Sequence, residues 1–209
     1  MKKLIQKIGA TQVGSFAKGF IANCSGVAMT EFAMLLPLIF LIAVGSFEVS
    51  RYALMTQKMD RISATVADLV ARDEALTAAE MDNLLDSIEH LASPFEFDGL
   101  GMVVVTSVVG RDGKDPLIIG QKSKGSLADK SSLIGSNGGT AKLPAVFTDQ
   151  DGQTLENDEG LIVTEVFYKF SPFFAGAGGS YIADDFLSGI DIYRQSFFRP
   201  RFSERTTFE

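Results

Sequence analysis

The chain contains an almost unbroken run of apolar residues at positions 27–47. About 20 apolar residues in a helix, at roughly 1.5 Å each, cross a bilayer core of ~30 Å, so the run predicts a transmembrane helix. Only Glu31 interrupts it. An ionised carboxylate at membrane depth costs roughly 2.5 to 3.5 kcal/mol on insertion scales, which makes Glu31 a candidate functional residue.

Beyond the run the apolar residues keep a helical spacing. Intervals of three and four residues place six of them on one stripe: Tyr52, Met55, Met59, Ile62, Val66 and Leu69. The spacing predicts one helix over residues 27–72, in lipid first and packed against protein afterwards. Pro37 predicts a kink in the membrane half, because its ring removes a backbone donor. The stripe packs on its own domain or contacts another subunit, and both interpretations stay open.

A second helix is predicted from Thr77, which forms a capping box with Glu80, to the Ser93-Pro94 pair that ends it. The period then changes to that of strands, with Val-rich and aromatic runs over residues 102–109, 117–119, 161–170 and 190–198. Residues 120–144 predict a long surface loop. The fold class is therefore α+β, with a long N-terminal helix packed as a stalk on a small antiparallel sheet.

Charge sets the expected orientation. Residues 1–26 carry four lysines and no acidic residue, and such a basic flank is retained on the cytoplasmic side of a membrane. We expect four segments: a basic leader at 1–26, a transmembrane helix at 27–47, a helical stalk with the second helix at 48–92, and an exported region at 93–209. These segments predict a single-pass protein of the inner membrane, with its C-terminal domain outside the cytoplasm.

The order of these features resembles the prepilin signature, in which a peptidase cuts after a glycine and leaves glutamate at the fifth mature position. Here the bond is Gly26-Val27, and Glu31 with Phe32 follows. Together with Pro37 and the closing residues 47–51, the segment resembles the TadE family of tight-adherence pilus assembly proteins. The resemblance implies a pilin-like fold, a prepilin peptidase and other pilus assembly components as partners, and pairing of Glu31 with the N-terminal amine of a neighbouring subunit.

Three other interpretations of the N-terminal segment stay open. A secretory signal would be cleaved after the small residues 43–45 and would release a soluble domain from Ser46. An uncleaved signal anchor would keep the leader, and Glu31 would then sit at headgroup level. A lipoprotein signal at Cys24 is the weakest, because Asn23 precedes the cysteine where a small residue is needed.

Composition excludes several classes of function. The net charge is −7, and without the four leader lysines the remaining 15 basic residues face 26 acidic ones, a balance of −11. Nucleic acid is therefore not an expected partner. The one cysteine lies in the leader, so the mature chain would hold no disulfide. The arginines 199, 201 and 205 are expected to form a solvated tail, and the many phenylalanines of the C-terminal third are expected in the core.

No catalytic motif or cofactor site emerges. His90 is the only histidine, so no metal cluster forms around it, and the chain has no nucleophile elbow and no Walker loop. The acid-rich residues 149–159 are a candidate calcium loop, although their glycine falls too early for an EF-hand. We expect an assembly protein rather than an enzyme. The alternatives are a secreted or anchored ligand-binding domain with a Phe-rich sheet, and an exported enzyme without a recognisable motif.

Overall fold

The structure is a computed structural model that describes residues 25–125, 127, 130–147, 155–172 and 189–208. The chain divides into two compact units after Val49, and the second unit is Ser50–Glu209. The long helix α2 (Ser25–Val70) contributes to both units. Its bounds agree with the helix predicted over residues 27–72.

The second half of α2 forms the base of the main core. Met55, Met59, Ile62 and Val66 are fully buried, as the apolar stripe predicts. Leu69, however, is 37% exposed, and the neighbouring Val70 is buried in its place. A helix turns once per 3.6 residues, so a stripe of strictly alternating threes and fours drifts away from the contact face over several turns.

The second helix, α3 (Ala78–Ala92), begins with the predicted capping box. The backbone N–H of Thr77 donates to the Glu80 carboxylate at 3.0 Å, and the Thr77 hydroxyl oxygen accepts from the N–H of Glu80 at 3.4 Å. The Thr77 N–H first, and then the Thr77 hydroxyl, which donates to the Glu80 carboxylate at 2.8 Å, lower the pKa of Glu80. Met81, Leu85 and Ile88 are buried, whereas Leu91 is 37% exposed. Ala92 is buried instead, and Ser93 caps the end of the helix.

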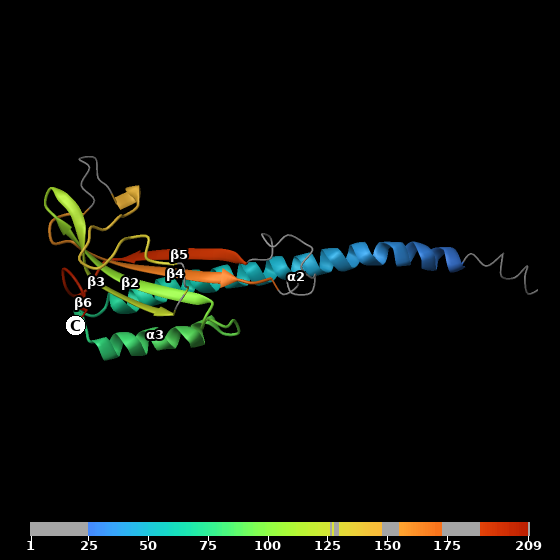
Figure 1. Cartoon of the computed structure of the whole chain (residues 1–209), viewed down its shortest axis with the longest axis horizontal. Helices are drawn as coiled ribbons and strands as arrows, with labels where there is room; N and C mark the ends of the chain where they lie inside the picture. The colour runs from blue at the N-terminus through green and yellow to red at the C-terminus, as the bar shows by residue number, and fades with distance from the viewer. Residues whose placement is uncertain (1–24, 126, 128–129, 148–154, 173–188, 209) are drawn as a thin grey trace, which may run out of the picture. The chain divides into compact units, whose positions relative to one another are not determined.

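Four antiparallel strands form the sheet in the order β3-β2-β4-β5. Their bounds are β2 (Gly101–Arg111), β3 (Lys114–Gly125), β4 (Gly160–Phe170) and β5 (Ile190–Phe198). Two short strands, β1 (Ala75–Leu76) and β6 (Thr207–Phe208), pair in parallel. Figure 1 shows α3 running along the sheet. The α+β class and the antiparallel sheet agree with the prediction.

Each face of the sheet has its own apolar core. On one face, residues of α2 and α3 pack against Val103 and Val105 of β2 and Ile162 and Val166 of β4. The opposite face has a second core that includes residues before and after η1 (Ala145–Phe147): Val108, Ile118, Ile134, Ala141, Leu155, Leu161 and Val163. Because strand side chains alternate, β2 and β4 serve both cores, which explains why their burial is nearly continuous.

The loop predicted over residues 120–144 is wrong at its start. Residues 120–125 are the second half of β3 and pair with Met102 through Ser107 of β2. Their Gln, Lys and Ser side chains led to the loop prediction. Polar residues are normal here because β3 is an edge strand. The later part of the predicted loop is not all at the surface, because Ile134 and Ala141 are buried in the second core.

The C-terminal tail is not simply solvated, contrary to expectation. Arg199 pairs with Glu159 at 2.5 Å, Arg201 pairs with Asp68 of α2, and Arg205 lies 3.9 Å from Asp158. The backbone N–H of Arg201 also donates to the carbonyl of Ala71 at 2.9 Å. The tail is thus tied to the end of α2, where Asp68 also pairs with Arg72.

The phenylalanines of the C-terminal third divide between core and surface. Phe167 and Phe170 are buried, Phe197 and Phe198 are half-buried, and Phe202 is exposed. The core interpretation is thus confirmed for the buried pair and wrong for Phe202. Three others, at positions 173, 174 and 186, lie outside the described residues.

Candidate cleavage and assembly site

The predicted scissile bond lies in the first turn of α2. Gly26 and Val27 are exposed, and a Cβ built on Gly26 would meet no other atom within 4 Å. Packing within the described chain therefore does not require a glycine at this position. A glycine weakens a helix by roughly 1 kcal/mol relative to alanine, so Gly26 lowers the stability of this first turn.

Glu31 lies one helical turn after Val27. Residues four apart share a helix face, so an amine at Val27 and the Glu31 carboxylate would be neighbours. The sequence has no lysine or arginine between Lys18 and Arg51. Among the described residues no side chain pairs with Glu31, whereas the neighbouring Thr30 hydroxyl donates to the Val27 carbonyl at 2.8 Å. Residues 19–50 therefore offer no basic side chain to Glu31.

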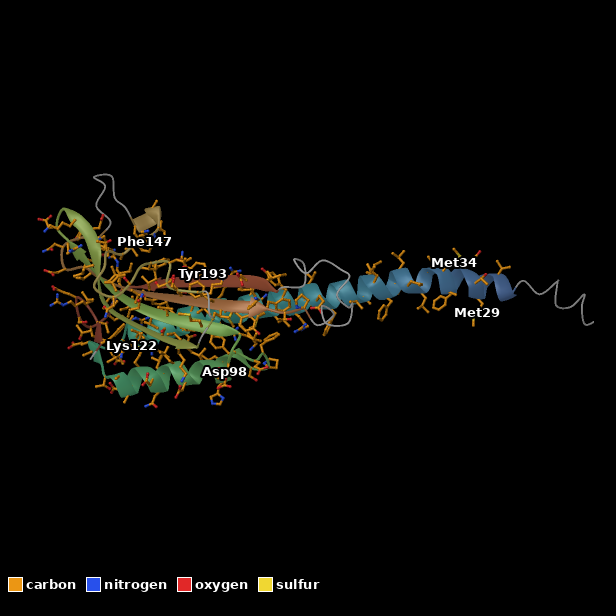
Figure 2. The ribbon with its side chains drawn as sticks, in the orientation of Figure 1. Met29, Met34, Asp98, Lys122, Phe147 and Tyr193 are labelled. Atoms are coloured by element: carbon orange, nitrogen blue, oxygen red, sulfur yellow. The ribbon has the colours of Figure 1, made fainter. Side chains whose placement is uncertain are left out.

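Apolar side chains surround the helix beyond this point. Phe32 is exposed, and so is every large apolar residue from Met34 to Ile42. Met29 and Met34 point away from the helix axis (Figure 2). Within the described part of the chain, α2 is the one helix long and apolar enough to cross a membrane, and none of its most apolar window is buried. The helix fits a single-pass membrane anchor.

Pro37 lies inside α2, which is continuous from Ser25 to Val70. Proline has no N–H, so the carbonyl of Ala33 lacks its usual donor four residues on. The kink predicted at Pro37 stays a prediction.

The candidate catalytic and metal residues remain unsupported. His90 is exposed on α3, and no group of three His, Cys, Asp or Glu among the described residues is arranged to hold a metal ion. Half of the predicted calcium loop, residues 149–154, lies outside the described residues. In the described half, the Glu159 carboxylate accepts from the N–H of Glu156 at 2.9 Å and pairs with Arg199, so it is already occupied.

A buried carboxylate at the centre of the sheet was not predicted from the sequence. Glu165 of β4 is fully buried on the face opposite α2 and α3. Its oxygens accept from the Ser132 hydroxyl, the Leu133 N–H at 2.9 Å and the Tyr193 hydroxyl at 3.0 Å. Burial first, and then the charge of Glu165, raise the pKa of Tyr193 above its ordinary range. A glutamate in an otherwise apolar strand was the available signal.

Residues 26–68 match a family model described as TadE-like protein. The match confirms the resemblance seen in the sequence; it begins at Gly26, covers Glu31 and Pro37, and includes none of the sheet. Neither the curated proteins nor the solved structures contain a significant match to the chain.

Proposed function

We propose that this TadE-like chain is a pseudopilin-like, membrane-anchored component of the tight-adherence pilus apparatus. It is cut after Gly26 by a prepilin peptidase and acts by binding other subunits rather than by catalysis. The observation that carries the proposal is the position of the family match, which starts at the residue before the proposed cut and includes Glu31.

The role of Glu31 follows from electrostatics in a low-dielectric medium. Cleavage would create a charged α-amine at Val27, and a carboxylate in lipid is tolerated when a cation neutralises it. No basic side chain lies in the sequence between Lys18 and Arg51, so that amine, from this subunit or a neighbour, is the nearest cation. Pairing between subunits would then favour ordered assembly over random clustering.

The proposed location is the inner membrane, with residues 1–26 in the cytoplasm and the domain after Val49 outside it. The lysine-rich leader supports this orientation, because basic flanks are retained on the cytoplasmic side. Membrane lipid surrounds the exposed apolar residues of α2, and the peptidase and the other pilus components are the proposed protein partners.

Substitution of Glu31 separates cleavage from assembly. We expect Glu31→Ala and Glu31→Gln to be cut normally, as shown by intact mass, yet to fail in co-isolation with the pilus apparatus and in pilus production. Thr30→Val is the matched control, because it changes a neighbouring polar residue without removing a charge, and it should assemble normally. Full assembly by both Glu31 variants would contradict the proposal and favour an anchored ligand-binding domain.

A further inference from the structure

The four-stranded sheet has two edge strands, β3 and β5, and they are protected to different degrees. An open edge offers unpaired N–H and C=O groups to any other strand, so proteins usually cover it or place lysine, proline or bulges there. β3 has all of these features: Pro116, two lysines at 122 and 124, and register shifts against β2.

A covering segment completes the protection of β3. The N–H of Ile118 donates to the Gly139 carbonyl at 2.9 Å, and the N–H of Gly138 donates to the Ile118 carbonyl at 3.0 Å. Leu117 forms a bridge with Thr140. The outer side of β3 is therefore already paired over its first half.

β5 has none of these protective features over its nine residues Ile190–Phe198. It contains no lysine and no proline, and its pairing with β4 runs without a register shift. Among the described residues no backbone group bonds to its outer side, although the Arg194 guanidinium donates to the Tyr193 carbonyl at 2.8 Å and would have to give way to an added strand. By the usual rules of sheet edges, β5 is available for a further strand.

The register identifies the backbone groups that face outward. The N–H of Lys169 donates to the Leu100 carbonyl, so odd-numbered residues of β4 bond to β2 and even-numbered ones bond to β5. Tyr168 pairs with Ile192, so the even-numbered residues of β5 face β4. The outward N–H and C=O groups belong to Asp191, Tyr193, Gln195 and Phe197.

A pocket adjoins this edge. It has a volume of about 340 Å³ and lies on the face opposite α3, between β4, β5 and the residues Leu127, Lys130, Ser131 and Leu133. Phe167 and Tyr193 form an aromatic wall with ring centroids 5.0 Å apart, and Lys130 pairs with Asp191 at 2.5 Å beside it. Figure 2 shows Tyr193 where it projects from β5. A long apolar side chain from a neighbouring strand would reach this pocket.

We propose that β5 accepts an extended strand of another polypeptide of the pilus apparatus, with one apolar side chain in the pocket. The inference rests on the proposed function, which supplies the partner. Main-chain hydrogen bonds to the four outward-facing residues would give affinity, and the aromatic pocket would give selectivity, as in other cases of strand addition to a sheet edge.

A second copy of this chain fits the edge poorly. Phe170 and Ile190 pair at the end of the sheet where Arg51 lies 5.3 Å from the Phe170 ring, close to the point where the apolar segment joins the domain. If two β5 strands paired antiparallel, the Phe170–Ile190 ends of the two copies would lie at opposite ends of the joined sheet. Both copies are anchored in one membrane near that end, so this pairing is disfavoured. Pairing of β5 with β3 of a neighbour meets an edge that is covered over its first half and carries Lys122 and Lys124 in its second half.

Hydrogen exchange of the full chain in three preparations tests the proposal. These are the protein purified in detergent, membranes from cells that make this chain alone, and membranes from cells that make the whole apparatus. We expect the amides of Asp191, Tyr193, Gln195 and Phe197 to exchange at least about tenfold more slowly only with the apparatus. Equal exchange in all three, or slow exchange without the apparatus, would overturn the proposal; the latter would show that residues 173–188 or a second copy occupy the edge.

A pair of variants at Gln195 isolates the main-chain contact. Gln195→Pro removes one outward N–H and no bond to β4, whereas Gln195→Ala removes the side chain and keeps the N–H. We expect the protection to disappear in the proline variant and to remain in the alanine variant, with equal thermal stability as the check on folding. Cells that make pili without this chain would refute the proposed function, whereas loss of pili on deletion with unchanged β5 exchange would refute only the strand addition.

Discussion

Replacement of Glu165 by alanine tests whether the buried carboxylate holds residues 132–134 on the sheet. In Glu165→Ala the Tyr193 hydroxyl keeps Gln195 as an acceptor at 2.8 Å, but the Leu133 N–H and the Ser132 hydroxyl lose theirs. A shielded donor without a partner costs about 1–3 kcal/mol. The Leu133 N–H and the Ser132 hydroxyl are only part-buried, so together their loss should lower the free energy of unfolding by roughly 2–4 kcal/mol.

Glu165→Gln is the matched control for this change. The amide oxygen can accept from Leu133 and Tyr193, while the Ser132 oxygen accepts from the new amide nitrogen, so the loss should stay below about 1 kcal/mol. Because residues 130–133 also line the pocket beside β5, the alanine variant should loosen that pocket as well.

Urea unfolding of the full chain in detergent measures both variants. Near-ultraviolet circular dichroism reports the tertiary structure through the tyrosines, since the chain has no tryptophan. At a slope near 2 kcal/mol/M, a loss of about 3 kcal/mol lowers the urea midpoint by roughly 1.5 M. An alanine variant with the wild-type midpoint, or a glutamine variant as unstable as alanine, would refute the role given to Glu165.

Two further predictions concern buried polar groups. The Thr164 hydroxyl is buried without a partner, so Thr164→Val should raise the free energy of unfolding by about 1 kcal/mol in urea titrations, whereas Thr106→Val should lower it because Thr106 accepts from Gln121 at 3.0 Å. Because the pKa of Tyr193 is raised in the folded chain, the unfolded chain loses the hydroxyl proton of Tyr193 at a lower pH. The free energy of unfolding should therefore fall above about pH 10. Urea midpoints measured at each pH should show this fall, and Tyr193→Phe should flatten it.

Local patterns made much of the fold predictable. The stripe of Met55, Met59, Ile62 and Val66 indicated both the helix and its buried face, because burial on one side of a helix leaves a period near 3.6. The capping box at Thr77 indicated where α3 begins, since its two hydrogen bonds need only residues three apart. The site at Gly26 and Glu31 could be proposed from the sequence for the same reason, because its residues lie within one stretch of chain; it stays a prediction.

The features that sequence missed depend on contacts between distant residues. The second half of β3 is polar because it is an edge, and Glu165 is satisfied by Ser132 and Tyr193, which lie 33 and 28 residues away. Neither fact has a local signature. The same holds for the tail, where Arg201 finds Asp68 across 133 residues.

The measurement that tests the central claim most directly is intact-mass and N-terminal analysis of the protein extracted from host membranes, with and without the prepilin peptidase. The account predicts a chain that starts at Val27 only when the peptidase is present. A chain that starts at Ser46, or one that keeps Met1 in both strains, would contradict cleavage after Gly26 and the role proposed for Glu31.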